Sequence, residues 1–427
     1  MVIVDKVLQQ REDADNPIRI GLIGAGFMGR GIALQIITAG VGMKLVAIYN
    51  RSVSEAVRAY NDAGISDTKH ADTVIHLEDC IKKNRYVVTD DVNLLCAAEC
   101  IDILVEVTGE VEFGAHVVLE SIKHGKHIVL MNSELDAALG PVLKDYADRA
   151  GVVYTNSDGD QPGVIMNLFR FVQGIGCRPV LAGNIKGLQD PYRTPETQKA
   201  YGEKYHQKSR MVTSFADGTK ISMEMAVVAN CTGFKVGKRG MYGPCCKHVN
   251  EALSLFPMEQ MLDGGLVDYL LGAEPAPGVF VIGYNEHPIQ QQYLTYYKMG
   301  DGPLYVFYVP YHLCHFEVPH TIARAVLFND ATAAPRGGPV CEVITAAKRD
   351  LKTGEVLDGI GGFTCYGMLE NADIAYSEQF LPMSFSKDCR LARDINRDEI
   401  LTYADVLLPK GRLCDDLRSE QAGRYIG

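Results

Sequence analysis

The chain has 427 residues, of which 47% are hydrophobic and 22% charged, with 42 Gly and 18 Pro. This composition is typical of a globular protein with more than one domain and excludes a disordered, collagen-like or coiled-coil chain. Lys and Arg number 42 against 53 Asp and Glu, and the formal net charge of −11 argues against a nucleic-acid or anionic-membrane surface.

No apolar run approaches the roughly 20 residues of a membrane span, and residues 1–15 lack the long apolar segment of a secretory signal. The 12 cysteines are irregularly spaced and form no Cys-x-x-Cys pair. We therefore expect reduced thiols in a cytoplasmic protein that has neither a membrane nor a nucleic-acid partner.

The first part of the chain alternates predicted strands and helices. Strands are predicted at 18–23, 44–49, 101–107 and 127–131, and helices after the first glycine turn, from Ser54, over 115–123 and from Gly140 to Gly151. This alternation predicts βαβ units around a parallel sheet, because parallel strands need helical crossovers.

A glycine pattern follows the first predicted strand directly and opens the first helix. It comprises Gly24, Gly26, Phe27, Met28 and Gly29 in the spacing Gly-x-Gly-x-x-Gly. The first glycine allows a tight turn, the second lets backbone approach a pyrophosphate, and the third lets the helix lie close to the strand. In this strand–turn–helix context the pattern predicts a Rossmann dinucleotide-binding domain, which we place at 1–155.

The end of the second strand should distinguish NAD from NADP. It reads Tyr49, Asn50, Arg51, Ser52, with no carboxylate to bind an NAD ribose, whereas Arg51 offers a guanidinium for a 2′-phosphate. This favours NADP over NAD, unless Arg51 is only a solvated surface charge. Thr108 with Gly109, and Asn132 with Ser133, follow later strands, where the nicotinamide end of the cofactor is expected.

From about Gly151 the pattern changes to mixed segments that predict an α+β catalytic domain, placed at 156–330. Residues 331–339 are a Pro/Gly-rich hinge, and a small β-rich module with a charged tail is expected at 339–427. The expected fold class is therefore α/β, with a Rossmann domain, an α+β domain and a small C-terminal module.

The densest polar stretch, at 156–163, contains Asp158, Asp160 and Gln161. Two carboxylates beside amides suit acid/base chemistry or a divalent cation such as Mg or Mn, and an Asx turn with solvated carboxylates is the alternative. Asn184 and Lys186 follow between glycines, where a partly buried lysine could stabilise an enolate oxygen or could simply be a surface residue.

Residues 215–220 are interpreted as a hairpin turn, followed by an apolar segment that contains Glu224. Lys235, Lys238 and Arg239 then place three cations close together in an acidic chain. A phosphorylated or carboxylated substrate would explain them, and a solvated basic loop is the alternative.

Several of these stretches together resemble one family across roughly the first 330 residues. They are the glycine turn, VEVTGEVEFGA from Val105, HGKHIVLMNSELDAALGP from His124, NSDGDQPG from Asn156, GNIKGLQDP from Gly183, and FADGTK with VANCTG. The resemblance is to homoserine-dehydrogenase-like oxidoreductases, including 1-deoxy-D-xylulose 5-phosphate reductoisomerase-like enzymes and D-apionate oxidoisomerases. The stretch from Val340, with AAKRDLKTGEVLDGIGG, resembles a SAF module of the β-clip type. Ser133 stands where homoserine dehydrogenases have a lysine, which argues against homoserine as the substrate.

The resemblance implies a homo-oligomeric NAD(P)-linked oxidoreductase that couples rearrangement of a small anionic polyol, ketose phosphate or sugar acid to hydride transfer. Carried onto this chain, it implies that Lys186 stabilises an oxyanion and that Asp158, Asp160 and Glu224 move protons or hold a cation. The expected substrate contacts are Gln161, Asn184, Lys235, Lys238 and Arg239.

The leading interpretation is conversion of 1-deoxy-D-xylulose 5-phosphate to 2-C-methyl-D-erythritol 4-phosphate, a step of isoprenoid precursor synthesis. The alternatives are an oxidoisomerase of a branched sugar acid such as D-apionate, a simple dehydrogenase, and an NADP-binding regulator without turnover. The carboxylates beside a lysine argue against the regulator, because a sensor has no need of acid/base groups.

Overall fold

The computed structural model describes the backbone of residues 2–426 and the side chains of residues 4–426. The chain divides into two compact units. Unit 1 consists of the residues up to Asp160 together with Leu313–Ala334, and unit 2 consists of Gln161–His312 together with the residues from Pro335 onward. The grouping differs from the three expected domains, because 313–330 belongs with the first unit and the C-terminal module with the second.

Unit 1 contains a seven-stranded sheet in which every pair of neighbouring strands is parallel. Its strand order is β3-β4-β2-β1-β5-β6-β7. The strands are β1 (Ile18–Ile23), β2 (Met43–Tyr49), β3 (Thr68–His70), β4 (Tyr86–Thr89), β5 (Ile103–Glu106), β6 (His127–Leu130) and β7 (Tyr154–Asn156). The strand order reverses direction at β1, between β2 and β5, and ligands of such sheets bind beyond the carboxyl ends of the strands at this point.

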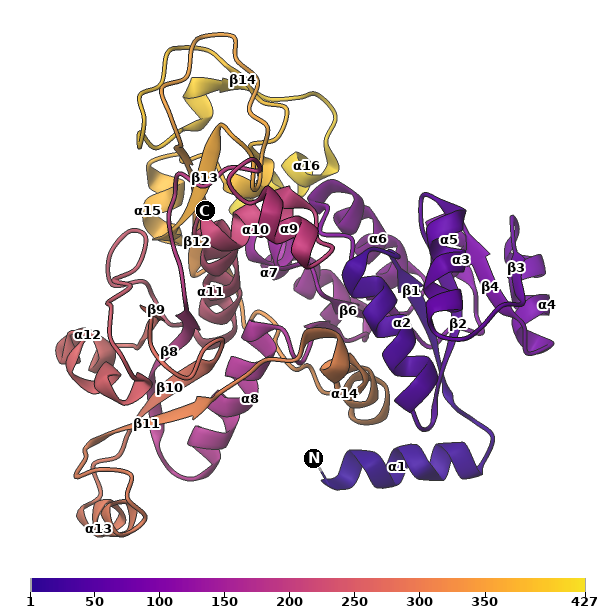
Figure 1. Ribbon diagram of the computed structural model, residues 1–427, viewed down its shortest axis with the longest axis horizontal. Coiled ribbons are helices and arrows are strands. Elements are labelled where there is room, and N and C mark those ends of the chain that lie inside the picture. Colours follow the sequence, from indigo (N-terminus) through magenta and orange to yellow (C-terminus); the bar gives the residue numbers. More distant parts are fainter. Residues whose placement is uncertain (1, 427) are drawn as a thin grey trace. The chain divides into compact units, whose positions relative to one another are not determined.

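Helices connect the strands of unit 1 and cover its sheet (Figure 1). The connecting helices are α2 (Phe27–Ala39), α3 (Val53–Asp62), α4 (Val74–Lys82), α5 (Val92–Ala97), α6 (Val111–Lys123) and α7 (Ser133–Ala150). Unit 1 also contains α1 (Val2–Asp13), which precedes β1, and α14 (Cys314–Phe328), which contacts α1 and α2. The predicted α/β fold is confirmed, and β3, β4 and β7 are strands that the sequence analysis did not predict.

The predicted start of the helix at Gly140 was wrong. α7 begins at Ser133, where the side chain of Asn132 accepts a hydrogen bond from the Leu135 N–H at 3.1 Å, and Pro141 lies inside the helix. A proline costs one backbone hydrogen bond within a helix, but the surrounding residues of α7 are almost all buried. Burial of residues 133–143 of this helix therefore outweighs the local signal of the proline.

Unit 2 is built on a mixed four-stranded sheet in the order β11-β10-β8-β9. Its strands are β8 (Arg178–Lys186), β9 (Leu266–Leu271), β10 (Val279–Tyr284) and β11 (Leu304–Val309). The connecting helices are α8 (Gln161–Gly174), α9 (Lys199–Lys204), α10 (Ser209–Ala216), α11 (Thr219–Thr232), η1 (Val249–Ser254), α12 (Met258–Leu262) and α13 (Pro288–Tyr296). Val249, Phe256 and Met261 belong to the same buried cluster as Phe280 of the sheet.

The C-terminal module is part of unit 2. It contains the hairpin β12 (Cys341–Ala347) and β13 (Cys365–Asn371), the short pair β14 (Arg390–Leu391) and β15 (Val406–Leu407), and the helices α15 (Ala372–Ser377), η2 (Met383–Phe385), η3 (Tyr403–Asp405) and α16 (Leu413–Tyr425). α11 contacts β12 and β13 as well as α8, β8 and β9 (Figure 1). All but one of the residues of α11 are consequently buried.

The hairpin turn predicted at 215–220 was wrong. Asp217 and Gly218 instead join α10 to α11, and Gly218 has a φ of +88°. An Asp-Gly pair signals a reversal of the chain but not the type of the flanking elements, which here are helices. None of the helices between Val2 and Tyr425 combines the length and apolarity that crossing a membrane requires.

The buried carboxyl of Asp136 on α7 provides a test of unit 1. Tyr154 Oη and Asn156 Nδ2 donate to it at 2.7 and 3.1 Å, and burial raises its pKa to about 6. An acid whose pKa is raised by folding contributes stability that is fully present below its unfolded pKa and is lost as the pH rises through the folded value.

We expect Asp136→Asn to remove this dependence. The difference in free energy of unfolding between variant and wild type should shift in favour of the variant by about 3 kcal/mol as the pH rises from about 4 to about 6. Urea titrations across this range measure the shift. Asp148→Asn, at an exposed carboxylate near the end of the same helix, is the matched control. If the difference in free energy of unfolding between Asp136→Asn and wild type stays constant over this pH range, the pKa of Asp136 is not raised by folding.

Candidate functional site

The glycine turn after β1 has the geometry that its spacing predicts. Gly24 has a φ of +109°, a backbone conformation that side chains disfavour. A Cβ on Gly29 would lie 2.0 Å from the carbonyl oxygen of Gly24, so only glycine lets α2 approach the turn this closely. Gly24 and Gly29 are therefore required by the fold itself.

Gly26 differs from these two glycines. A Cβ on Gly26 would meet nothing within 4 Å, and Gly26 occupies the N-cap position of α2 without a side-chain cap. Phe27 is exposed and Met28 half-buried beside it. An open helix N-terminus with room above a glycine fits the pyrophosphate of a dinucleotide, which would hydrogen-bond to backbone N–H groups there.

The end of β2 lies against the same turn. Asn50 Oδ1 accepts from the N–H of Ala25 at 3.1 Å, and Asn50 Nδ2 donates to the carbonyl oxygen of Ser52 at 3.0 Å. Arg51 is exposed. Asn50 thus joins the glycine turn to the segment that contains Arg51. This contact is consistent with a cofactor ribose at the end of β2, which stays a prediction.

A buried carboxylate that the sequence analysis did not single out organises the ends of β5 and β6. Glu106 Oε1 accepts from the N–H and hydroxyl of Thr108, and Glu106 Oε2 accepts from Asn132 Nδ2 at 2.8 Å. Burial raises the pKa of Glu106, opposed by these hydrogen bonds. Gly109 continues the turn with a φ of +71°, and Ser133 is buried at the start of α7. The sequence feature that could have identified Glu106 is the presence of a glutamate within an otherwise apolar strand.

Asp158, predicted to move protons or hold a cation, anchors α14 within unit 1. Its carboxylate accepts from Thr332 Oγ1 at 2.8 Å, Thr321 Oγ1 at 3.0 Å and Arg324 at 3.3 Å. Arg324 also forms an ion pair with Asp330 at 2.8 Å. The contacts support a structural role, and the catalytic role of Asp158 stays a prediction.

Asp160 and Gln161 lie where the chain passes from unit 1 to unit 2. Both are buried, and Asp160 Oδ2 has no hydrogen-bond partner among the described residues. Gln161 begins α8. An unpaired buried carboxylate oxygen is costly and calls for a ligand, water or proton, so Asp160 remains a candidate site residue.

Four predicted site residues meet in unit 2. Lys186 Nζ, at the end of β8, donates to Gln161 Oε1 at 3.2 Å and to Glu224 Oε2 at 3.3 Å. Asn184 Nδ2 donates to the same Glu224 oxygen at 2.9 Å, while Asn184 Oδ1 is buried without a partner among the described residues. We call Gln161, Asn184, Lys186 and Glu224 the lysine cluster.

Lys186 is the more accessible member of the ion pair in the lysine cluster. The side chain of Glu224 is 3% exposed and that of Lys186 is 16% exposed. An ammonium has three N–H donors, and within the described chain Lys186 uses them on two oxygens. Lys186 therefore retains one donor for a ligand oxygen, beside the Glu224 carboxylate.

The basic stretch is not a set of three available cations. Lys235 pairs with Asp373 at 3.3 Å and Arg239 with the buried Glu370 at 2.7 Å, both carboxylates of the C-terminal module. Lys238 lies over the ring of Tyr242 at 5.4 Å. The anion-binding role of these cations stays a prediction, and two of them form ion pairs with the C-terminal module.

In the part of the chain that the structure describes, no three His, Cys, Asp or Glu side chains gather closely enough to hold a metal ion. The divalent cation suggested by the stretch 156–163 is therefore not supported.

Matches to known protein families place a boundary in the chain close to residue 160, where unit 1 passes into unit 2. Residues 24–156 match the homoserine dehydrogenase NAD-binding domain, and residues 159–318 match the catalytic domain of oxidoreductase DRL. The chain thus contains one segment similar to the NAD-binding domain of homoserine dehydrogenases and one similar to an oxidoreductase catalytic domain. Neither match extends to the C-terminal module, and the SAF interpretation stays a prediction.

Homoserine dehydrogenase from Corynebacterium glutamicum is 41% identical over 66 residues, which are 16% of this chain and 15% of the relative. The chain thus spans only a small part of the length of that relative. Among solved structures, scyllo-inositol dehydrogenase from Lactobacillus casei is 14% identical over 69% of this chain and 76% of its own, with a TM-score of 0.37. Biliverdin reductase from Synechocystis sp. PCC 6803 is 12% identical over 73% and 91%, with a TM-score of 0.39. Likeness at these scores carries no argument about function.

The two glycines of the turn allow a matched test of the cofactor site. We expect Gly26→Ala to leave stability almost unchanged but to weaken NADPH binding by about tenfold or more, about 1.4 kcal/mol, because the added methyl group occupies the space for the pyrophosphate. Gly29→Ala should instead destabilise the fold by about 1 to 3 kcal/mol. Thermal melts and fluorescence titration separate the two effects. Unchanged NADPH affinity in Gly26→Ala would contradict the assignment.

Proposed function

We propose that the protein is an NADP-dependent reductoisomerase that converts 1-deoxy-D-xylulose 5-phosphate to 2-C-methyl-D-erythritol 4-phosphate. The observation that carries the proposal is the lysine cluster, which lies in the unit that contains most of the match to an oxidoreductase catalytic domain. NADPH would supply the hydride. Exposed Arg51, at a β2 end without a carboxylate, supports NADP over NAD.

The lysine cluster suits a rearrangement of a hydroxyketone. Such a reaction removes a hydroxyl proton, moves a carbon–carbon bond and develops negative charge on a carbonyl oxygen. The third N–H of Lys186 would stabilise that oxygen, and Glu224 would hold the released proton. Asn184 Nδ2 holds the Glu224 carboxylate in place. Asn184 Oδ1, which has no partner among the described residues, would accept a hydrogen bond from a substrate hydroxyl.

A branched sugar acid such as D-apionate, oxidised with rearrangement, is the second candidate. The observation that favours it is the pairing of Lys235 and Arg239 with carboxylates. This leaves less positive charge for a phosphate dianion, whereas a singly charged carboxylate needs fewer cations. Homo-oligomerisation and a cytoplasmic location stay predictions.

The reaction itself is tested with purified protein, NADPH or NADH, and 1-deoxy-D-xylulose 5-phosphate, with and without Mg or Mn. We expect NADPH consumption and a branched polyol phosphate identified by mass and NMR. Lys186→Met should lower kcat by about 100-fold or more, because an oxyanion-stabilising donor is lost, while NADPH affinity is unchanged. Lys199→Met, at an exposed lysine of the same unit, is the control.

Normal turnover by Lys186→Met would contradict the role of the lysine. If the wild type binds NADPH tightly but leaves the ketose phosphate unchanged, the reductoisomerase assignment is wrong. Oxidation of D-apionate with NADP reduction would then support the second candidate.

Cofactor choice is tested at Arg51. We expect Arg51→Ala to weaken NADPH binding by about 10- to 100-fold, because charge-assisted hydrogen bonds to the 2′-phosphate are lost, and to leave NADH binding unchanged. Arg58→Ala removes an exposed arginine of the neighbouring helix α3 as the matched control. Titrations with both cofactors give the ratio of affinities, and an equal loss for NADPH and NADH would show that Arg51 does not read the 2′-phosphate.

A further inference from the structure

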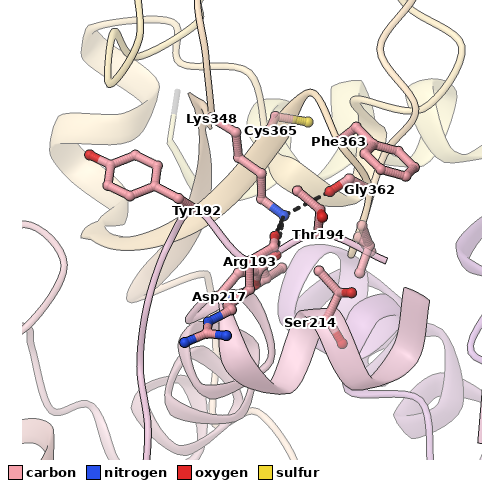
Figure 2. A network of polar contacts seen from close by, with 12 residues as sticks. Tyr192, Arg193, Thr194, Ser214, Asp217, Lys348, Gly362, Phe363 and Cys365 are labelled. Carbon is pink, nitrogen blue, oxygen red and sulfur yellow. Dashed lines mark hydrogen bonds and ion pairs between the residues drawn. The ribbon is translucent and has the colours of Figure 1, made fainter. Parts of the chain in front are cut away.

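A second buried lysine lies in unit 2, outside the lysine cluster. Lys348 follows β12, and its side chain is 2% exposed. Its Nζ donates to Asp217 Oδ2 at 2.8 Å, to the Arg193 carbonyl oxygen at 2.7 Å and to the Gly362 carbonyl oxygen at 2.8 Å, as Figure 2 shows. Three N–H groups meet three acceptors, so Lys348 has no donor left for a ligand.

Two of these acceptors belong to segments that carry the lysine cluster. Arg193 lies in the segment that leaves β8 directly after Lys186. Asp217 lies in the turn just before α11, where its Oδ1 accepts from the Thr219 N–H at 2.9 Å, and Glu224 lies on α11. One ammonium group from the C-terminal module therefore ties the loop that follows β8, which bears Lys186, to the turn that precedes α11, which bears Glu224.

Further contacts hold the segment 187–194 at the same place. The Asp190 N–H donates to the Ala216 carbonyl oxygen at 2.7 Å, next to Asp217. Tyr192 Oη donates to Asp398 at 2.8 Å, and the Arg397 guanidinium lies 4.9 Å from the Tyr192 ring centre. Asp398 and Arg397, like Lys348, belong to the C-terminal module. The segment 187–194 is therefore held by contacts with this module and by contacts with the turn between α10 and α11.

We propose that Lys348 is a positioning residue for Lys186 and Glu224, and that the C-terminal module is a working part of the substrate site. The reaction it serves is the proposed function, on which this inference rests in part. Lys348 does not touch the substrate; it fixes the spacing between an ammonium and a carboxylate that sit on separate elements. Small displacements of such groups strongly reduce catalysis, because reacting atoms must be aligned.

Removing Lys348 alone would leave the Asp217 carboxylate buried without its cation, which is destabilising in itself. Burial already raises the pKa of Asp217, and Lys348 opposes that rise. The informative variant is therefore the double substitution Lys348→Met with Asp217→Asn, which removes both charges together. It retains the shape of the pair but loses the hydrogen bonds from Lys348 to Arg193 and Gly362.

The C-terminal module provides a matched control. Arg418 of α16 pairs with Glu342 of β12, and their side chains are 8% and 1% exposed. This pair is also buried and charged, but Arg418 contacts Glu342 and the ring of Tyr376, which both belong to the C-terminal module. The control variant is Arg418→Met with Glu342→Gln, in the full chain with NADPH present.

The first measurement needs no substrate. Trace acetic anhydride acetylates lysines, and peptide mass spectrometry compares the rate at Lys186 with that at exposed Lys199. We expect the Lys348/Asp217 variant to raise the relative rate at Lys186 several-fold, because Lys186 is released from Glu224 and Gln161, and the control variant to leave it unchanged. The second measurement is turnover of 1-deoxy-D-xylulose 5-phosphate, where kcat should fall by about 100-fold with NADPH affinity unchanged.

An unchanged Lys186 rate in a folded Lys348/Asp217 variant would overturn the proposal, as would an equal rise in the control variant. If the rate rises only in the Lys348/Asp217 variant and the wild type does not turn over the ketose phosphate, positioning stands and the proposed reaction fails. If wild-type turnover is observed and survives the substitution with kcat unchanged, the reaction stands and positioning fails.

Discussion

A carboxylate removed from water must be given a cation or several hydrogen-bond donors, and both units of this protein are organised around that requirement. In unit 1, Arg324 of α14 reaches Asp158, and Glu106 receives donors from Thr108 and Asn132. In unit 2, Lys186 reaches Glu224 and Lys348 reaches Asp217. Apart from Thr108, which is close to Glu106 in the sequence, the partners come from separate elements, so these pairings fix one element against another.

The two lysines of unit 2 show how the same pairing serves different purposes. Lys348 is 2% exposed and its three donors are matched by three acceptors, so its position is fixed and it has nothing to offer a ligand. Lys186 is 16% exposed and has two such partners. Solvent access and one remaining donor, more than the presence of a charge, distinguish a group that can act on a substrate from one that holds the structure.

Local patterns were sufficient for β1, β2, β5 and β6 of unit 1, because a strand, a glycine turn and a helix occur within the reach of a few residues, but they missed β3, β4 and β7. They were insufficient where tertiary contacts decide. The Gly140-Pro141 pair predicts a helix start, but α7 begins earlier, where Asn132 caps it. The helix continues through Pro141 because the residues around the proline are buried. Asp217 and Gly218 signalled a reversal correctly, yet the identity of the flanking elements depends on α11 being enclosed between two sheets.

The candidate site was predictable in its members but not in its pairings. Gln161, Asn184, Lys186 and Glu224 were each named from residue type, and their meeting requires the register of β8 beside α11, which no short pattern contains. The basic stretch shows the converse limit. Lys235 and Arg239 look available in the sequence because Glu370 and Asp373, which neutralise them, lie more than a hundred residues away. A local excess of charge therefore indicates a ligand only after the long-range partners are counted, and here Lys235 and Arg239 both have such partners.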